Sequence, residues 1–302
     1  MLRGQEVCKI SAHKVGILGV SYMDNTQGIK ARSLSKNEAR LVSHLEFERQ
    51  TLVTSSEAAE ILGAPYRHIK NTLDSLVRKG WLVRVRTGLY ELVPAASGGF
   101  RAGDWFVSLQ GFRTPCYLSF LSAAYILGLS SQRPQLAQVA TPKLVRARYA
   151  GVEQDVEQVV VGESKFFGFR KMQRDGLEIN VAEPAKAVVD CLYHPSKAGG
   201  ILEVARILAK GVKQASGSKL VDCAIQMNNR ALVQRLGYLV DALGLELAKS
   251  PRSRLLRYVS QGRRPHAYLG SVRTFGKEGE WNPTWRITDN VGKERLRKEL
   301  EF

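Results

Sequence analysis

Apolar side chains recur every three or four positions over residues 55–80, with one interruption, which is typical of two short amphipathic helices. Gly63 ends the first helix, and Ala64-Pro65 begins the second, because proline suits a first helical turn, where its missing N–H would be unpaired anyway. Gly80 ends the second helix. The apolar positions are Ala58, Ile61 and Leu62 in the first helix and Ile69, Leu73, Leu76 and Val77 in the second. The pattern predicts a helix, a tight turn and another helix.

Two capping boxes indicate where helices begin. Thr54 and Glu57 have the S/T-x-x-E spacing, in which each side chain bonds the backbone N–H of the other residue, so a helix should begin at Ser55. Ser35 and Glu38 repeat this spacing and predict an upstream helix over residues 35–49. The buried stripe of that helix would be Leu41, Val42 and Leu45.

An alternating segment follows the second helix of the pair. Residues 81–85 and 89–93 are β-prone and flank Arg86-Thr87-Gly88, where Gly88 can adopt the positive φ of a tight hairpin. Arg84 and Arg86 alternate with valines, so we expect both arginines on one outward face of the ribbon. Three helices and a ribbon make a winged helix-turn-helix, which in most cases inserts its recognition helix into the major groove of DNA.

The polar face of the recognition helix carries groups that recognise bases. Arg67, Asn71, Asp74 and Arg78 lie opposite the apolar stripe. Arginine can bond guanine, and asparagine adenine, through two hydrogen bonds each, and a good pair discriminates by roughly 1–3 kcal/mol. We therefore predict base contacts for Arg67 and Asn71, and phosphate or minor-groove contacts for the other basic residues. The full predicted DNA-binding set is Arg67, His68, Lys70, Asn71, Ser75, Arg78, Arg84, Arg86 and Thr87. A solvated basic face, or a winged helix used only to dock a protein, is the alternative.

Charge agrees with a nucleic-acid partner. The chain has 45 Lys+Arg against 28 Asp+Glu, a formal charge of +17, and the excess extends through the whole sequence. Such an excess favours polyanions and makes their binding salt-dependent. No apolar run is long enough to span a bilayer, and no signal peptide is visible. The four cysteines are scattered without a CxxC pair, so we expect no disulfide or zinc site and a reducing cytoplasm. The sequence also lacks a G-x-x-x-x-G-K-[S/T] phosphate loop, and we expect no cofactor or metal.

At 302 residues the chain exceeds one winged helix, and we expect several parts. These are an N-terminal extension over 1–33, the winged helix over 34–94 and a larger domain over 100–302, with a linker of the sequence PAASGG before it. Lys30-Ala31-Arg32 could act as an arm on DNA or have no function, and a true start near Met23 is an alternative.

The larger domain mixes helical and strand patterns, which predicts an α/β (α+β) fold with a small sheet covered by helices. Predicted strands are 137–140, 156–161, the segment around 166–169 and 177–181; predicted helices are 119–127, 183–192, 201–208, 219–227 and 231–243.

The order of several segments resembles the AbiEi family of antitoxins from type IV (abortive infection) toxin–antitoxin systems. The resemblance covers residues 34–290 and rests on the winged helix at 51–93, VATPK at 139–143, INVAEPAKAVVDCLYHPSKAGG at 179–200, RLGYLVDALG at 235–244 and WRITDN at 285–290. It implies a DNA-binding autorepressor that is not an enzyme and binds promoter inverted repeats as two copies. It further implies that the C-terminal domain counteracts a cognate nucleotidyltransferase toxin.

Most of the shared segments have the pattern of packing helices. Arg235 could pair with a carboxylate such as Asp190 or Asp241. Two basic sets could instead contact DNA or the toxin, with a solvated face as the alternative for each. They are Lys143, Arg146 and Arg148, and Arg252, Arg254, Arg257, Arg263 and Arg264.

An enzyme is the competing class. Asp155 followed by Glu163-Ser164-Lys165 resembles the D…E-x-K arrangement of metal-dependent nucleases, in which carboxylates bind Mg²⁺ and a lysine stabilises the attacking water. The motif is short and common in basic proteins. A nuclease targeted by a winged helix is therefore the alternative function.

Overall fold

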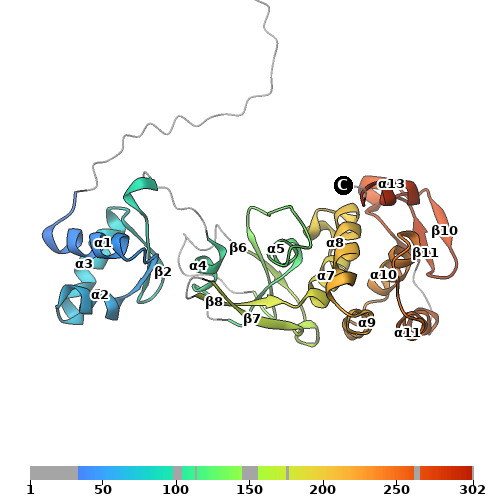
Figure 1. The fold of residues 1–302 in the computed structure, drawn as a ribbon, viewed down its shortest axis with the longest axis horizontal. Coiled ribbons are helices and arrows are strands. Elements are labelled where there is room, and N and C mark those ends of the chain that lie inside the picture. Colours follow the sequence, from blue (N-terminus) through green and yellow to red (C-terminus); the bar gives the residue numbers. More distant parts are fainter. Residues whose placement is uncertain are drawn as a thin grey trace, which may run out of the picture. The chain divides into compact units, whose positions relative to one another are not determined.

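The computed structural model describes residues 33–97, 104–112, 114–144, 156–174, 177–261 and 266–300 (Figure 1). The predicted arm at 30–32, Asp155, and most of the N-terminal extension lie outside these residues. Among these residues the two large hydrophobic cores lie in the N-terminal helices and in the larger C-terminal domain, and Val85, Leu89 and Val107 form a small third cluster. The chain thus has the mixed α/β fold that the sequence predicts, while the domain boundaries stay a prediction.

The N-terminal core belongs to a winged helix. Its elements are α1 (Lys36–Phe47), β1 (Leu52–Thr54), α2 (Ser55–Leu62), α3 (Tyr66–Arg78), β2 (Leu82–Arg86) and β3 (Leu89–Leu92). The strands form an antiparallel sheet in the order β1-β3-β2, in which β1 is a strand that the sequence did not predict. Leu45, Leu73 and Leu76 are fully or almost fully buried where the helices meet.

Both capping boxes are confirmed. Thr54 donates its backbone N–H to the Glu57 carboxylate at 2.7 Å, and the Glu57 backbone N–H donates to the Thr54 hydroxyl at 3.1 Å. The second box, at Ser35 and Glu38, is likewise formed at the start of α1. Gly63 adopts φ +61° and ends α2, as the sequence predicts, because a left-handed residue stops the helix and glycine adopts it without strain.

The C-terminal domain is built on a mixed sheet. Its strands are β4 (Tyr117–Leu118), β5 (Ala137–Thr141), β6 (Val156–Val160), β7 (Phe169–Arg174) and β8 (Leu177–Ala182), in the order β6-β5-β4-β8-β7. β5 pairs with β6 and β4 with β8 in parallel, whereas the β4–β5 and β7–β8 pairs are antiparallel. The central strand β4 was not predicted, because two residues carry no readable alternation.

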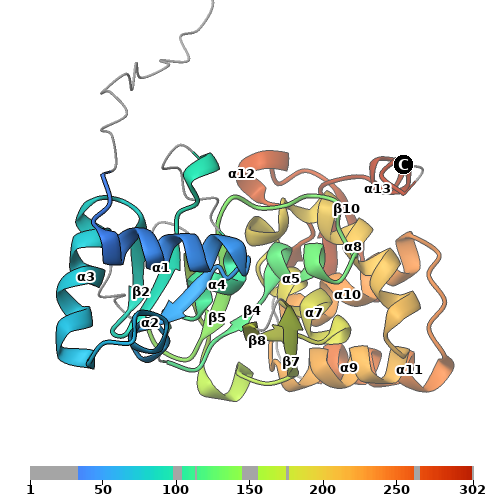
Figure 2. The same ribbon diagram turned by 60° about the vertical axis from the view of Figure 1, so that its left-hand side comes forward.

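Helices complete this domain (Figure 2). Along the chain, α4 (Trp105–Leu109) precedes the strands of the sheet, and α5 (Phe120–Ile126) lies between β4 and β5. Five helices follow the last strand of the sheet: α7 (Pro184–Tyr193), α8 (Ile201–Gln214), α9 (Gly217–Gln226), α10 (Arg230–Ala242) and α11 (Lys249–Ser260). Short elements are η1 (Ala95–Ser97), η2 (Glu163–Lys165), η3 (Pro195–Ala198), α12 (Val272–Phe275) and α13 (Lys293–Lys298). α7 is the hub, because it packs against α5, α8, α9, α10 and β8. In the described part of the chain no helix is both long and apolar enough to cross a membrane.

A buried ion pair lies within this hub. Lys186 and Asp190, one turn apart on α7, are bonded to each other and are inaccessible to solvent. Lys186 also donates to the Tyr117 hydroxyl at 2.8 Å, and Ser119 donates to Asp190 at 2.7 Å. Charges can be buried in this way because each is paired and hydrogen-bonded. The pair connects the helix layer to the central strand β4.

The last part of the domain is a small sheet of β9 (Ala267–Tyr268), β10 (Glu280–Asn282) and β11 (Ile287–Asp289), in the order β10-β11-β9. It packs on α10 through Trp285, whose ring covers Gly237 so closely that a Cβ there would lie 2.2 Å from it. Tyr238 donates its hydroxyl to Asp289 at 2.5 Å. The segments RLGYLVDALG and WRITDN, which are 40 residues apart in the sequence, are therefore packing partners.

The proposed pairing of Arg235 with Asp190 or Asp241 is wrong. Asp190 is occupied by Lys186, and Asp241 binds Arg252 and accepts from the Trp285 indole N–H at 2.7 Å. Arg235 instead donates to the carbonyl of Leu192 at 3.4 Å. The sequence pattern placed α10 correctly but could not show which neighbouring helix its arginine meets.

Candidate nucleic-acid interface

Helix α3 has one buried face and one exposed polar face. Ile69, Leu73 and Leu76 are at most 2% exposed and fix the helix on the winged-helix core. On the other side the exposed members of the predicted set are Arg67, His68, Lys70, Asn71 and Arg78, and Ser75 is half-buried. The two predicted base-contacting residues, Arg67 and Asn71, thus lie one turn apart on an open surface.

An exposed aromatic residue begins the same helix. Tyr66 is 62% exposed, directly before Arg67, and was not predicted as a site residue. Residues at the start of a recognition helix lie closest to the base edges. Its position could have been noticed in the sequence, since Tyr66 lies outside the apolar stripe of α3.

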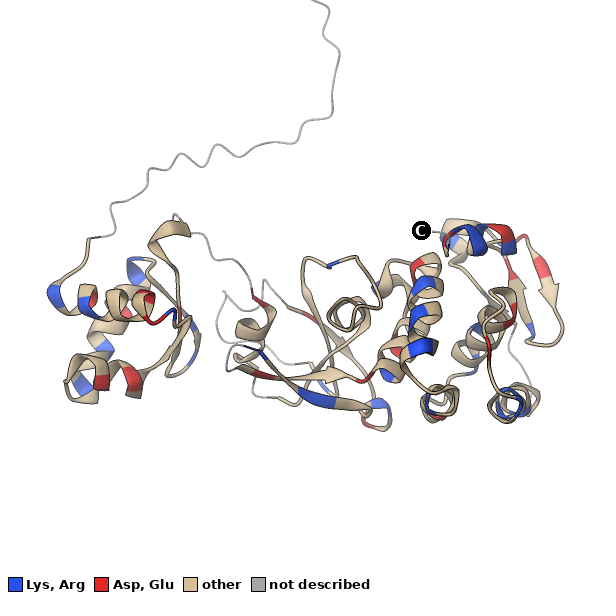
Figure 3. Ribbon diagram, viewed as in Figure 1, with Lys and Arg blue, Asp and Glu red and all other residues tan. Residues whose placement is uncertain are grey.

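The charges of the winged helix are unevenly distributed between its helices. α2 carries Glu57 and Glu60, whereas α3 carries Arg67, Lys70 and Arg78 and one acidic residue, Asp74, which is paired with Arg84 (Figure 3). Because the positive groups lie on the helix with the exposed amide, the same surface offers both attraction to phosphate and hydrogen bonding to bases.

The hairpin tip forms as predicted. Gly88 adopts φ +76°, Thr87 before it is exposed, and Arg86 is half-buried at the end of β2. This places a cation and a hydroxyl at the tip of the ribbon, in the position of a wing.

Arg84 differs from the prediction. The register of β2 shifts between Arg84 and Arg86, so the two arginines do not share one outward face. The Arg84 guanidinium turns toward α3, where it contacts Asp74 at 3.3 Å and donates to the Tyr90 hydroxyl at 2.8 Å. Arg84 thus joins the ribbon to the recognition helix, and the expected outward orientation is wrong for this residue.

The other end of α3 is fixed by a second ion pair. Lys79 follows the helix and lies 2.7 Å from the carboxylate of Glu38 on α1, which is almost completely buried. Burial alone would raise the pKa of Glu38, but the bonds from Lys79 and from the Ser35 backbone outweigh it and lower the pKa to about 2. Helix α3 is therefore attached by polar bonds as well as by its apolar face.

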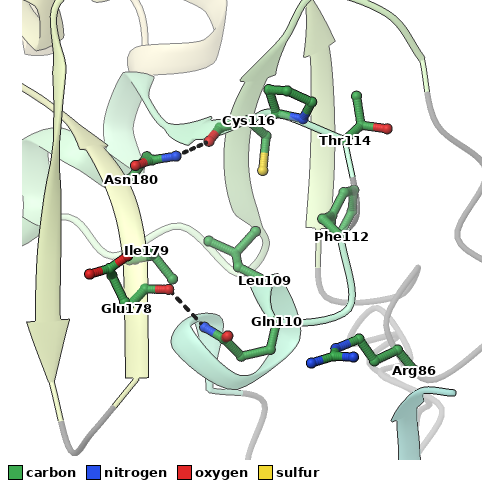
Figure 4. A pocket seen from close by; sticks show the side chains of 10 residues that line it. Arg86, Leu109, Gln110, Phe112, Thr114, Cys116, Glu178, Ile179 and Asn180 are labelled. Atoms are coloured by element: carbon green, nitrogen blue, oxygen red, sulfur yellow. Dashed lines mark hydrogen bonds between the residues drawn. The ribbon is translucent and has the colours of Figure 1, made fainter. Parts of the chain in front are cut away.

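The C-terminal domain has a cleft of a different kind (Figure 4). It lies between α4 and β8, where Gln110 donates to the carbonyl of Glu178 at 2.9 Å and Asn180 to that of Cys116 at 3.2 Å. Burial raises the pKa of the Cys116 thiol to about 11, so this thiol is protonated and unreactive near neutral pH. The cleft offers amides already bonded to backbone and no activated nucleophile among the residues drawn.

The nuclease motif does not form a metal site in the described residues. Glu163 lies in η2, and Lys165 donates to the Tyr193 hydroxyl at 2.8 Å. Within the described ranges, no three His, Cys, Asp or Glu side chains are close enough to hold a metal ion. Asp155 is outside those ranges.

The two other basic sets are only partly described. Lys143 is exposed, and Arg146, Arg148, Arg263 and Arg264 lie outside the described residues. Arg252 pairs with Asp241 and Arg254 with Asp222, at 2.9 and 2.7 Å. These pairs make the set on α11 less available to a partner than its sequence indicates.

The chain matches two descriptions of one protein family. "Transcriptional regulator, AbiEi antitoxin" matches residues 45–93, and "AbiEi antitoxin C-terminal domain" matches residues 117–242. The crystal structure of the RV2827C protein from Mycobacterium tuberculosis is similar in fold, with a TM-score of 0.63 at 18% identity over 90% of this chain and 97% of that chain. A comparison with curated proteins gave no match. The chain belongs to the AbiEi antitoxin family, with a transcriptional-regulator domain followed by an antitoxin domain.

Proposed function

We propose that this chain represses its own promoter and counteracts a cognate nucleotidyltransferase toxin. The observation that carries the proposal is the polar face of α3, on which Arg67 and Asn71 are exposed opposite a buried apolar face. The family match supports it, because a transcriptional regulator acts on DNA and an antitoxin on a toxin.

In this proposal the residues have separate roles. Arg67 and Asn71 bond base edges in the major groove, as guanidinium and carboxamide groups do in specific complexes. His68, Lys70, Ser75 and Arg78 lie beside the phosphates, and Arg86 and Thr87 do so at the wing. Arg84, bonded to Asp74 and to the Tyr90 hydroxyl, orients the wing relative to α3.

Two copies would bind inverted repeats in the promoter, since a twofold-symmetric operator matches two recognition helices about one helical turn apart. The C-terminal domain would act against the toxin, directly or indirectly, without catalysis, cofactor or membrane of its own. A cytoplasmic location accompanies this role.

A promoter–reporter assay tests the repressor role. The DNA upstream of the chain's own gene drives a reporter gene. The chain is expressed in the same cells, as wild type or as the double variant Arg67→Ala/Asn71→Ala. The matched control is Asn37→Ala/Arg40→Ala, which removes the same two residue types from exposed positions of α1. We expect repression by the wild type and the control and its loss in the α3 variant. Equal repression by all three proteins would reject α3 as the recognition helix.

The antitoxin role needs a separate experiment. The chain, or its α3 double variant, is co-expressed from a foreign promoter with a nucleotidyltransferase encoded beside it. If the C-terminal domain carries the activity, both proteins restore growth, because no operator is involved. Failure of the wild type to restore growth against that enzyme would contradict this part of the proposal.

A further inference from the structure

Basic side chains gather at the end of α7, far in sequence from the winged helix. Lys165 donates to the Tyr193 hydroxyl at 2.8 Å, and its ammonium lies 4.5 Å from the centre of that ring. The rings of Tyr193 and His194 are 4.2 Å apart. Arg235 donates to the backbone carbonyl of Leu192, the residue before Tyr193, at 3.4 Å. Residues from η2, α7 and α10 thus converge; we call Lys165, Tyr193, His194 and Arg235 the α7 basic cluster.

The cluster lacks counter-charges within the chain as described. Lys165 and Arg235 are half-buried, and neither forms an ion pair with a carboxylate among the described residues. The Nε of Arg235 is buried and has no hydrogen-bond partner there. Asp190 binds Lys186 and Glu157 binds Lys197, whereas Glu163, in the same turn η2 as Lys165, is exposed and forms no ion pair among the described residues. Partly burying two cations without a counter-charge is unfavourable.

The carboxyl end of α7 is the simplest structural explanation for these cations. A helix end carries about half a negative charge, and cations near it are stabilising. Lys165 and Arg235 bring two positive charges, so this explanation leaves most of the charge uncompensated. The uncompensated positive charge also affects the pKa of His194. Burial lowers this pKa most, and Lys197, Lys165 and Arg235 lower it further, whereas Asp190 raises it.

We infer that the α7 basic cluster binds a phosphate group. An ammonium, a guanidinium with an unused Nε–H, a phenol and an imidazole are all groups that donate to phosphate oxygens. A bound phosphate would supply both the missing charge and the missing acceptor. Inorganic phosphate, a terminal phosphate of a nucleotide and a phosphodiester of single-stranded nucleic acid share this chemistry. The cluster lies within residues 117–242, so this site belongs to the antitoxin domain and goes beyond the proposed recognition of promoter DNA.

Phosphate titration of the full-length protein tests the site. Thermal unfolding is followed as inorganic phosphate replaces chloride at constant ionic strength, because a ligand specific for the folded state raises the unfolding temperature. The variants are Lys165→Gln, Arg235→Gln and the milder Arg235→Lys, with Lys210→Gln on α8 as a control for the loss of one exposed charge.

We expect phosphate to stabilise the wild type beyond chloride and to bind the Gln variants about tenfold more weakly or worse. Arg235→Lys should fall between them, since it keeps the charge but not the Nε–H. The control should bind like the wild type. No stabilisation beyond chloride, or an equal loss in Lys210→Gln, would overturn the site.

The source of the phosphate is then assigned in the Arg67→Ala/Asn71→Ala background, which lacks the proposed base contacts of α3. The remaining basic residues of α3 are the same with and without Lys165→Gln, so a difference between those two proteins reports the α7 basic cluster. The probes are adenosine monophosphate and a single-stranded oligonucleotide of about ten nucleotides without terminal phosphates. If the oligonucleotide binds and Lys165→Gln weakens this binding, the site recognises a nucleic-acid backbone. If only the nucleotide binds, the site recognises a terminal phosphate. Binding of inorganic phosphate alone assigns the free ion. No binding of any of the three rejects the inference.

Discussion

Two polar residues of α3 differ in their surroundings, because one is open to solvent and the other is bonded to the ribbon. Asn71 is exposed, whereas Asp74, three residues later, is half-buried and paired with Arg84 of the ribbon. The helical wheel placed both on the polar face, and only the structure distinguishes them. The reason is physical: the wheel gives a direction around the helix, but the neighbouring ribbon decides which part of that face it covers.

Asn71 and Arg86 should have different signatures in DNA binding. Asn71→Ala removes a base contact, so we expect it to lower the preference for operator over scrambled DNA by roughly 1–3 kcal/mol. Arg86→Ala removes a phosphate contact, so it should weaken both DNAs alike and reduce the slope of log K against log salt by about 1. Fluorescence anisotropy at several salt concentrations checks both. Loss of preference in Arg86→Ala with none in Asn71→Ala would reverse our assignment.

Glu38 should make the free energy of unfolding pH-dependent. Its pKa is about 2 in the folded chain against an ordinary value of 4.5, so its stabilising effect is complete above 4.5 and is lost as the pH falls toward 2. We expect Glu38→Gln to be less stable than the wild type by roughly 1–3 kcal/mol at pH 7. The difference should shrink between pH 4.5 and 2 in urea titrations. A difference that is constant with pH would contradict the ion pair with Lys79.

At the scale of elements, the sequence predicts best where local signals coincide. α2 has a capping box, an apolar stripe and a terminal glycine, and it begins at Ser55 as expected. β4 and the small sheet of β9, β10 and β11 were missed, because these strands have two or three residues and are defined by pairing with distant segments. The same limit applies to the candidate site. Local pattern predicts which side of α3 is exposed, but the α7 basic cluster depends on contacts between η2, α7 and α10.

The contact between α10 and Trp285 should not tolerate a side chain at Gly237. A Cβ there would lie 2.2 Å from the buried ring, so we expect Gly237→Ala to destabilise the chain by about 1–3 kcal/mol or more. Chemical denaturation measures this. The control is Gly162→Ala, since Gly162 has φ −62° and no atom within 4 Å of an added Cβ. It should change stability by no more than about 0.5 kcal/mol. Equal stabilities of the two variants would show that α10 and Trp285 are not packed this way.

At the scale of the molecule, we expect positive charge to act on DNA in two ways, one general and one specific to a sequence. The formal charge of +17 attracts polyanions in general, whereas in our proposal the exposed groups of α3 supply the specificity for one promoter. Salt and sequence should therefore act independently: raising salt weakens all DNA binding, and changing the operator affects only the contribution of α3. A second anion site in the antitoxin domain would add to the first effect without changing the second.

The most direct test of the account is the affinity of the purified chain for its own promoter, measured in moderate salt with and without Arg67 and Asn71. We predict that Arg67→Ala/Asn71→Ala binds the promoter at least about 30-fold more weakly, with an unchanged unfolding temperature, while Asn37→Ala/Arg40→Ala binds like the wild type. Undiminished binding by the folded α3 variant would contradict the assignment of α3 as the surface that recognises DNA.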